Sequence, residues 1–364
     1  MNILHYSQAP PLKAGMENVL YYLTKEISKR HKTILQFNYN YRNQLPRISF
    51  GRVILRPIFI PDIPKFRAVY KDLAAYANLK KNLNKYKVDI LHTHFLVPGA
   101  LGSFVAKRKG IPSIITEHGM IYFQLNRNIE MRMIRYALKN ADKIVCIDYV
   151  MHNILLNMCD DKEKFEVITN GVDTKEFRPD YSKRNPKRVI FIGRLVEVKG
   201  PDFLFDAIPK VVNEIPDAEF WIVGDGHLKS DLEKRTRKMG IDRNIKFFGW
   251  VPMHKIPELI NKCSVFVSLQ QYDNFPSLSL MESMACGLSI IATDVGHTKR
   301  YIGKNSLLVK RGDIDSLADK LIVLLSNYNK SKRLGLISRK IVEKNHTWEI
   351  VANKYEKLYE QMIW

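Results

Sequence analysis

Two segments of the sequence combine residue types that suit the binding of a diphosphate. The first reads Phe191-Ile-Gly-Arg-Leu-Val-Glu-Val-Lys-Gly200, where Arg194 offers a fork of donors and Lys199 a point charge. Pro201 follows and predicts the start of a helix, whose positive end favours anions. Two cations at that place suit a diphosphate, although the same pair standing alone would be interpreted as solvated loop charges.

The second segment is Tyr272-Asp-Asn-Phe-Pro-Ser-Leu-Ser-Leu-Met-Glu-Ser-Met-Ala-Cys-Gly287. Ser277 is the predicted N-cap of a helix, which leaves the backbone amides of residues 278–280 free to face an anion. Glu282 lies about one turn into this helix among apolar residues, where a carboxylate needs a partner. A ribose diol would serve, and so would the cation of a structural ion pair.

These segments belong to an alternation of strands and helices. In the N-terminal half, strands are predicted over residues 2–6, 33–37, 88–94, 112–117, 143–147 and 166–169, with helices over 16–30 and 65–87. In the second series, strands are predicted over 188–192, 219–223, 244–248, 264–269 and 289–293, and helices over 201–215, 228–239, 278–286, 314–328 and 348–362. This alternation predicts an α/β protein with two doubly wound parallel sheets. Ligands of such sheets bind beyond the carboxyl ends of the strands, where both segments fall.

Five more short motifs accompany the two segments: Ala14-Gly15-Met-Glu17, Glu117-His118-Gly119, Asn170-Gly-Val-Asp173, Val223-Gly-Asp-Gly226 and Phe247-Phe-Gly-Trp-Val251. With all seven in order, nearly the whole chain resembles the retaining nucleotide-sugar glycosyltransferases of the GT-B fold, glycosyltransferase family 4 (glycosyl transferases group 1). The resemblance implies two Rossmann-like domains that face each other across a cleft. They would comprise residues 1–177 and 189–347, joined by a linker over 178–188, with 348–364 returning to the first domain.

The resemblance also implies roles for individual residues. Arg194 and Lys199 would bind the donor diphosphate, Glu282 would hold the ribose hydroxyls, and His118 would face the reacting sugar and hydrogen-bond one of its hydroxyls. The remaining implied contacts to the donor are the backbone of Phe275, Pro276, Ser277 and Leu278 at the phosphate and sugar, that of Val251 at the base, and Gly15 near the phosphates from the opposite domain.

The sequence departs from the family pattern at one position. The family usually has two acidic residues separated by seven positions, but counting back from Glu282 reaches Asn274, and the nearest carboxylate, Asp273, is one position further. Either Asn274 contacts the donor sugar as an amide, or the loop bulges and Asp273 takes the role. Both alternatives stay open at this point, and so does the preference for a donor sugar.

The implied reaction is a hexosyl transfer from a UDP- or GDP-linked donor to a hydroxyl of a sugar or lipid-linked acceptor, in glycan, polysaccharide or glycolipid synthesis, with the anomeric configuration retained. Arg194, Lys199 and helix amides would neutralise the leaving diphosphate, so no metal or other cofactor is expected. Front-face attack assisted by the leaving phosphate is the mechanism that the family suggests. Two alternatives are a nucleotide-sugar epimerase of the same fold and a basic nucleic-acid-binding protein, although no nucleic-acid-binding module is evident and no such partner is expected.

Positive charge is concentrated in one part of the chain. The net charge is +21, and residues 1–143 hold 24 Lys and Arg against 8 Asp and Glu, while residues 144–364 hold 34 against 29. The predicted helix over residues 65–87 holds seven basic residues and one acid, Asp72. It would lie on an anionic membrane surface near a lipid-linked acceptor, or be an ordinary amphipathic helix with its lysines in water. Without a visible signal peptide or a membrane-spanning apolar run, the expected location is the cytoplasm, with peripheral attachment to the inner face of the membrane as the alternative that the helix suggests.

Other residues that carry chemistry predict no additional site. The four cysteines (Cys146, Cys159, Cys263 and Cys286) lie far apart and are interpreted as small reduced core residues. His92-Thr-His94 places two histidines on one strand face, but no third ligand at suitable spacing is evident, so packing or cleft-lining roles are preferred to a metal site. The segment from Gly224 to Lys229 begins like a dinucleotide fingerprint, but Lys229 replaces its third glycine, which disfavours nicotinamide binding.

Overall fold

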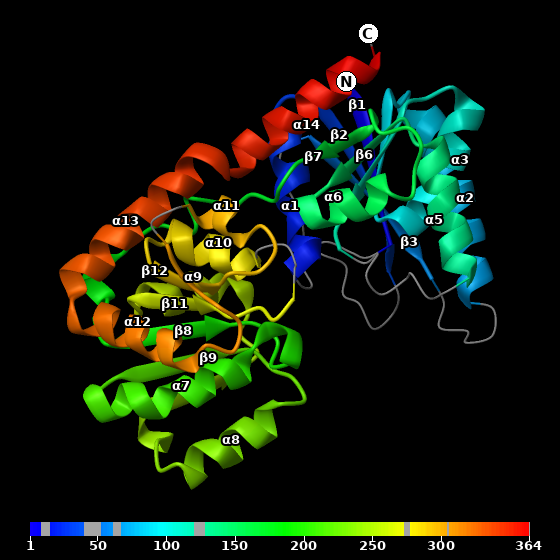
Figure 1. The fold of residues 1–364 in the computed structure, drawn as a ribbon. Coiled ribbons are helices and arrows are strands. Elements are labelled where there is room, and N and C mark those ends of the chain that lie inside the picture. The colour runs from blue at the N-terminus through cyan, green and yellow to red at the C-terminus, as the bar shows by residue number, and fades with distance from the viewer. Residues whose placement is uncertain are drawn as a thin grey trace. The chain divides into compact units, whose positions relative to one another are not determined.

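The computed structural model describes residues 1–8, 15–39, 52–60, 67–119, 128–272, 277–303 and 306–363, with side chains for all of these except 15–17 and 67–70. The chain divides into two compact units (Figure 1). Unit 1 comprises Met1–Gly171 and Trp348–Trp364, and unit 2 comprises Val172–Thr347. Each unit is built on one parallel sheet, which confirms the fold class predicted from the alternation of strands and helices.

The sheet of unit 1 is parallel throughout its described strands, in the order β3-β2-β1-β4-β5-β6-β7. The strands are β1 (Asn2–Ser7), β2 (Lys32–Tyr39), β3 (Val53–Phe59), β4 (Ile90–His94), β5 (Ser113–Glu117), β6 (Lys143–Cys146) and β7 (Phe165–Val167). The helices are α1 (Gly15–Ile27), α2 (Arg67–Tyr86), α3 (Leu96–Lys109), α5 (Asn128–Asn140), α6 (Tyr149–Leu156) and α14 (Trp348–Ile363). Helix α3 packs between α2 and α5, whereas α14, the red helix in Figure 1, packs against α1.

The sheet of unit 2 is also parallel, in the order β10-β9-β8-β11-β12-β13. Its strands are β8 (Arg188–Ile192), β9 (Glu219–Val223), β10 (Ile245–Gly249), β11 (Val265–Ser268), β12 (Ser289–Thr293) and β13 (Leu307–Val309). Its α-helices are α7 (Pro201–Glu214), α8 (Lys229–Lys238), α9 (Ile256–Asn261), α10 (Leu278–Ala285), α11 (Thr298–Ile302), α12 (Ile314–Ser326) and α13 (Tyr328–Asn345).

In each sheet the strand order reverses once, between β1 and β4 in unit 1 and between β8 and β11 in unit 2. The connections that leave the two central strands diverge at this switch point, which leaves room for a ligand at the carboxyl ends of the strands. In unit 2, these ends are Ile192 and Ser268, and the two segments suited to a diphosphate follow them directly.

The central strands are buried on both faces, as expected for parallel strands covered by helices. Every residue of β5 and β12 is buried. Three of the four cysteines are buried in these cores and all four are free, in agreement with their interpretation as reduced residues. Strand β3 was not predicted. It contains Pro57 and lies at the edge of the described sheet, where a residue without a backbone N–H is tolerated.

The boundary between the units differs from the one expected. Residues 172–188, expected as the end of the first domain and a linker, pack within unit 2. Phe177 is buried, and the Arg184 guanidinium donates to the carbonyl oxygens of Cys286 and Gly287 at 2.8 Å each. These bonds satisfy carbonyl groups at the C-terminal end of α10. The polar side chain of Arg184 therefore attaches this segment to unit 2, and the segment is not a flexible linker. The C-terminal helix α14 belongs to unit 1.

Helix α2 shows where the apolar residues of the basic segment point. Ala75, Leu79, Leu83 and Tyr86 are buried in the core of unit 1, whereas Leu73 is 63% exposed. The apolar face therefore packs within the protein, as in the ordinary amphipathic helix, and Lys80, Lys81 and Lys85 lie in solvent. Among the described residues, no helix combines the length and hydropathy needed to cross a bilayer.

Candidate active site

The loop that follows β8 is held in place by close main-chain contacts. Residues Glu197–Lys199 form a 3₁₀ helix (η2), and Gly200 follows with a φ of +64°. A Cβ atom on Gly200 would lie 2.0 Å from the carbonyl oxygen of Leu269, so only glycine fits against the loop after β11. A Cβ atom on Gly224 would likewise lie 1.9 Å from the carbonyl oxygen of Gly193. The loops after β8, β9 and β11 therefore pack main chain against main chain.

Helix α10 brings its N-terminus to the same loops. Ser277 caps the helix, since its Oγ accepts a hydrogen bond from the backbone N–H of Leu280 at 3.3 Å. Ser279 Oγ donates to the carbonyl oxygen of Ile192, the last residue of β8, at 2.9 Å. This bond joins the first turn of α10 to the strand end that immediately precedes the loop with Arg194. The expectation that the amides of residues 278–280 are all free is wrong for Leu280, whose N–H the cap uses. The remaining amides of the first turn and that loop lie at one edge of the sheet.

The two cations of the loop are close to each other and lack acidic partners among the described residues. Arg194 is exposed and Lys199 is half-buried. Burial, with a smaller contribution from the positive charge of Arg194, lowers the pKa of Lys199 to about 8. Within the described part of the chain, neither side chain forms a hydrogen bond or an ion pair. A bound anion would relieve the repulsion between them and favour the charged form of Lys199.

Glu282 is a half-buried carboxyl group on α10. Burial, and next the charge of Glu176, raise the pKa of Glu282 to about 8. None of the residues that the structure describes hydrogen-bonds or ion-pairs with it, so the structural ion pair is not the arrangement found. An ionised carboxylate accepts hydrogen bonds only, and a vicinal diol supplies two donors of matching spacing.

The other expected donor contacts are only partly described. Val251 follows β10 and is half-buried on the apolar cluster that contains Trp221. Gly15 is the first residue of α1 in unit 1. Four residues of the loop before α10 lie outside the described residues: Asp273, Asn274, Phe275 and Pro276.

In unit 1, Glu117 holds the end of β5 against the start of α3. Its carboxylate accepts hydrogen bonds from the backbone N–H groups of Leu96, at 2.9 Å, and Gly119, at 3.0 Å. A negative charge at the first turn of a helix is stabilising. Glu117 thus fixes both sides of His118, which is buried with its ring centroid 5.1 Å from that of Phe95. Burial lowers the pKa of His118 to about 3, so the imidazole is neutral.

Phe95, which follows β4, has an unusual backbone conformation. Its φ of +75° and ψ of +147° are adopted freely only by glycine and cost a phenylalanine about 1–3 kcal/mol. The conformation is held by hydrogen bonds from its N–H to the Thr116 carbonyl, at 2.8 Å, and from the Gly99 N–H to its own carbonyl, at 2.9 Å. Strain held in this way is characteristic of functional sites.

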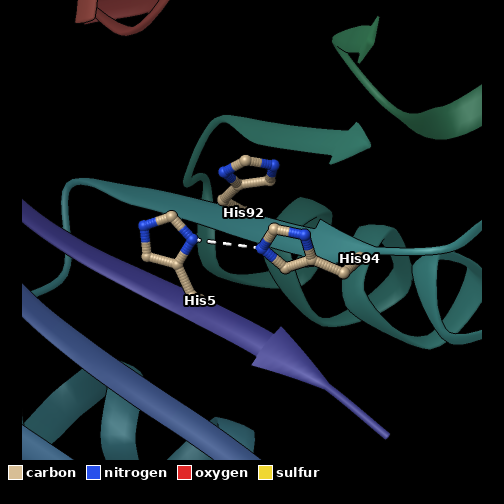
Figure 2. A group of neighbouring side chains, drawn as sticks. All are labelled: His5, His92 and His94. Atoms are coloured by element: carbon tan, nitrogen blue, oxygen red, sulfur yellow. Dashed lines mark hydrogen bonds between the residues drawn. The ribbon is translucent and has the colours of Figure 1, made fainter. Parts of the chain in front are cut away.

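Buried histidines gather beside Phe95. His5 of β1 and His92 and His94 of β4 lie on neighbouring strands with their rings turned toward one another (Figure 2). His5 Nδ1 and His94 Nε2 are hydrogen-bonded at 3.2 Å, and His94 Nδ1 and His118 Nε2 at 3.0 Å. His5 was missed from the sequence, because only the pairing of β1 with β4 places it opposite His92.

The expectation that no third ligand accompanies His92 and His94 is wrong, since ligand atoms of His5, His92 and His94 lie within 4.8 Å of one another. The arrangement nevertheless suits hydrogen bonding better than a metal ion. His92 Nδ1 hydrogen-bonds Tyr359 Oη at 2.7 Å and His92 Nε2 hydrogen-bonds Thr116 Oγ1 at 2.8 Å, so both nitrogens are occupied. A divalent ion would also need compensation for its charge in this buried place, and the three rings supply none.

Two doubly wound units, with two cations that no described residue pairs and a helix N-terminus at the switch point of the second, are the arrangement expected of the GT-B glycosyltransferase class. Residues 14–176 match the family described as Glycosyltransferase Family 4, and residues 173–341 match the family described as Glycosyl transferases group 1. The uncharacterized glycosyltransferase MJ1178 of Methanocaldococcus jannaschii is 30% identical over 308 residues, which cover 83% of this chain and 84% of that protein. The chain therefore belongs to the family 4 (group 1) glycosyltransferases.

Two further similarities bear on the fold and the substrates. The UDP-Gal:alpha-D-GlcNAc-diphosphoundecaprenol alpha-1,3-galactosyltransferase of Escherichia coli is 28% identical over 338 residues, covering 85% of this chain and 84% of that enzyme. The crystal structure of Anabaena HepE (Alr3699) in complex with UDP superposes with a TM-score of 0.80 at 17% identity, covering 99% of this chain and all of that one. The structural likeness confirms the GT-B fold.

Proposed function

We propose that this glycosyltransferase moves a hexosyl group from a nucleoside-diphosphate sugar to an acceptor hydroxyl with retention of the anomeric configuration. The observation that carries the proposal is that Arg194 and Lys199 belong to the loop after β8, that the first turn of α10 is hydrogen-bonded to the last residue of β8, and that no described carboxylate pairs with either cation. A diphosphate there would pair with both cations and with the amides of residues 278 and 279, which the cap does not use.

Stabilisation of the leaving group is the chemical task that these groups would perform. As the bond from the sugar to the diphosphate breaks, negative charge grows on the phosphate oxygens, and preorganised cations and amides stabilise that charge more than the ground state. Arg194 would bind two oxygens through its planar fork, and Lys199 would approach as a point charge. These groups supply the positive charge, so we expect catalysis without a metal ion. The departing phosphate would then take the proton from the acceptor hydroxyl on the same face of the sugar.

The nucleoside half of the donor would lie along α10 and β10. Glu282 would accept hydrogen bonds from the two ribose hydroxyls, which favour its ionised form and relieve the carboxyl of its unpaired state. The backbone at Val251 would meet the base. UDP is the favoured nucleotide, because the name of the Escherichia coli relative specifies UDP-Gal and the Anabaena structure holds UDP; GDP is the alternative.

The acceptor is proposed to be a sugar, free or carried on a lipid. The support is the name of the Escherichia coli relative, which specifies a sugar on diphosphoundecaprenol. The Asp273 or Asn274 side chain would contact the donor sugar. Replacing each by Ala separates the two alternatives, because the residue that touches the sugar should affect binding of the nucleotide sugar but not of UDP.

Binding of UDP to single variants of unit 2 tests the diphosphate site. We expect Arg194→Ala and Lys199→Ala each to weaken UDP binding by about tenfold to a hundredfold, the usual value of a charge-assisted hydrogen bond, and to depress sugar transfer further. Lys234→Ala, on the exposed face of α8, is the matched control and should bind UDP like the wild type. Unchanged UDP binding by both site variants would refute the site. Isomerisation of the donor without acceptor would instead identify an epimerase.

Attachment to an anionic membrane is proposed through charge alone. Lys80, Lys81 and Lys85 of α2 are exposed, and Lys109 of α3 joins them by donating to Asn84 Oδ1 at 2.9 Å. Near an anionic bilayer each lysine contributes about 1 kcal/mol. Changing all three α2 lysines to Gln should therefore abolish sedimentation with phosphatidylglycerol vesicles at low salt.

The matched control neutralises three basic residues of α8, in the variant Lys234→Gln, Arg237→Gln, Lys238→Gln. This variant should sediment like the wild type, because its charges lie in unit 2. Equal loss in the two triple variants would show that only net charge matters. Failure of the wild-type protein to sediment would exclude the membrane proposal and leave the transfer reaction untouched.

A further inference from the structure

His5, His94 and His118, called here the histidine chain, form a hydrogen-bonded line across three neighbouring strands of unit 1. His5 lies on β1, His94 ends β4 and His118 follows β5, so the line crosses the switch point of the sheet. Their exposed fractions are 0%, 2% and 6%. In Figure 2, the dashed line from His5 to His94 shows the first of the two bonds.

All three rings are neutral near pH 7. Burial lowers the pKa of His5 and of His118 to about 3, and burial followed by the neighbouring histidines lowers that of His94. A neutral imidazole has one N–H donor and one bare nitrogen acceptor. Each of the two hydrogen bonds in the chain needs one N–H donor and one bare nitrogen acceptor, which restricts how the protons can be arranged.

Counting donors leaves only two arrangements. If His5 Nδ1–H donates to His94 Nε2, then His94 carries its proton on Nδ1 and donates to His118, whose own proton is then on Nδ1. If His118 Nε2–H donates to His94 Nδ1, then His94 carries its proton on Nε2 and donates to His5. The three rings therefore share one tautomer, with the proton either on every Nδ1 or on every Nε2.

The two ends of the chain, His5 Nε2 and His118 Nδ1, are buried and have no hydrogen-bond partner among the described residues. One end is an N–H donor and the other a bare acceptor in either arrangement, so the protein itself favours neither strongly. A group that reaches His118 Nδ1 would decide between them. An oxygen lone pair selects the Nδ1–H form, and a hydroxyl proton selects the Nε2–H form.

We propose that the histidine chain is a single tautomeric unit through which His118 Nδ1 either donates to or accepts from a sugar hydroxyl while every ring stays neutral. His118 is the group that touches the substrate, and His5 and His94 are positioning residues that set its tautomer. The sugar as ligand rests on the proposed function, whereas the shared tautomer rests on the two hydrogen bonds alone.

Nitrogen-15 NMR of the histidine-labelled, full-length protein tests the shared tautomer, because protonated and bare ring nitrogens have well-separated shifts. We expect one tautomer, or one pair of populations, common to His5, His94 and His118. UDP-galactose or UDP-N-acetylglucosamine, whichever is turned over, should change these populations at all three rings together, whereas UDP alone should not. Different tautomers on two of the rings, a charged ring at pH 7, or no response to the sugar nucleotide would overturn the proposal. Displacement of the shared protons by one equivalent of Zn²⁺ would do so as well.

A substitution in the middle of the chain tests the coupling. His94→Leu removes both hydrogen bonds, so His5 and His118 no longer need the same tautomer, and the sugar nucleotide should change the populations at His118 but not at His5. We expect kcat to fall about tenfold, the value of one hydrogen bond, with UDP affinity unchanged. His94→Asn, whose amide can replace the ring as one donor and one acceptor, should restore kcat.

Tyr359→Phe is the matched control, because it removes a hydroxyl from the separate hydrogen bonds of His92 and leaves the histidine chain intact. A response of His5 to the sugar nucleotide in His94→Leu would overturn the proposal. If His94→Leu fails to fold, the spectra of the wild-type protein still decide. Absence of UDP binding in the wild type would refute the proposed function, and the shared tautomer would be judged independently.

Discussion

At the scale of single residues, Glu282 shows how a carboxyl group that lacks a partner among the described residues can weaken the protein that carries it. Its carboxyl group is half-buried beside Glu176, and no described residue donates a hydrogen bond to it. Ionising such a group costs free energy, which is why its pKa is raised to about 8. A ligand that donates hydrogen bonds to the carboxylate would offset this cost. Relief of the unfavourable state would then contribute to the free energy of ligand binding.

We therefore expect Glu282→Gln to stabilise the protein while weakening nucleotide binding. As pH rises from about 4.5 to 8, the unfolded chain releases the Glu282 proton and the folded chain retains it, so the wild type loses stability across this window. The variant should be more stable at pH 8 by about 1–3 kcal/mol and nearly equal at pH 5. Urea unfolding at the two pH values measures the difference.

Glu233→Gln on α8 is the control for this substitution and should show no such gain. UDP affinity of Glu282→Gln should fall about tenfold, because a hydrogen-bond acceptor for the diol is lost. Loss of stability in Glu282→Gln at pH 8 would mean that the carboxylate has a favourable partner in the protein without ligand. It would then contradict the proposal that ribose is the partner of this carboxylate.

Residue types and spacing were enough to single out Arg194, Lys199 and Ser277, because each stands next to a recognisable strand end or helix start. His5 could not be found in this way. It lies far from His94 in the sequence, and only the order of strands in the sheet brings the two rings together. The pairing of central strands is a property of the tertiary structure, which local patterns do not specify.

At the scale of elements, the hydrogen bond from Ser279 to the Ile192 carbonyl connects α10 to β8. We expect Ser279→Ala to lower the free energy of unfolding by about 1 kcal/mol and to weaken UDP binding severalfold, because the helix amides lose their alignment with the cation loop. Ser306→Ala is the matched control, since Ser306 Oγ donates to the Ile302 carbonyl at 2.7 Å. It should lose similar stability and retain UDP affinity; equal effects on binding would show that the bond has no role in aligning the site.

The tight approach of the loops gives a second prediction at this scale. Gly200 and Gly240 have nearly equal φ values, +64° and +66°, but a Cβ would collide with the Leu269 carbonyl only at Gly200. Gly240→Ala should therefore cost about 1 kcal/mol from backbone strain alone. Gly200→Ala should cost several times more, or prevent unit 2 from folding, as measured by urea unfolding followed by Trp fluorescence. Similar costs at the two positions would show that the loops can separate freely.

Strands with continuous apolar runs were predicted from the sequence within one or two residues, as in Arg188–Ile192 and Glu219–Val223. Two of the elements that were missed have weak local signals. β3 contains a proline, and α3 holds Pro98, Gly99 and Gly102 within its first turns. These glycines are explained by packing, because a Cβ on Gly102 would lie 2.3 Å from Thr93 Oγ1 and one on Gly99 2.5 Å from Ile115. Packing of that kind overrides helix propensity and is invisible before the sheet is known.

At the scale of the whole molecule, the chain passes from unit 1 to unit 2 after Gly171 and returns before Trp348. Helix α14 then completes unit 1. Trp348 stacks on Tyr22 with ring centroids 5.7 Å apart, Arg30 pairs with Glu356 at 2.7 Å, and Tyr355 hydrogen-bonds Thr116 at 3.0 Å.

Removal of α14 should therefore destabilise unit 1 selectively. In a chain that ends at Thr347, we expect faster amide hydrogen exchange in β4, β5 and α1, because their buried polar and apolar groups lose their cover. Exchange in β8, β11 and α10 should change little, since these elements make their contacts within unit 2. Uniformly faster exchange in both units would show that the two unfold as one cooperative body.

The return of α14 also has a consequence for biosynthesis. A ribosome makes every residue of unit 2 before it makes Tyr355 and Tyr359, the hydroxyl groups that meet Thr116 and His92. Until α14 is made, the polar and apolar groups of unit 1 that α14 will cover stay exposed in the nascent chain. Exposed groups of this kind bind chaperones and promote aggregation. Slower translation of residues 172–347 would prolong this exposure. The yield of native protein should therefore depend on the rate at which these residues are translated.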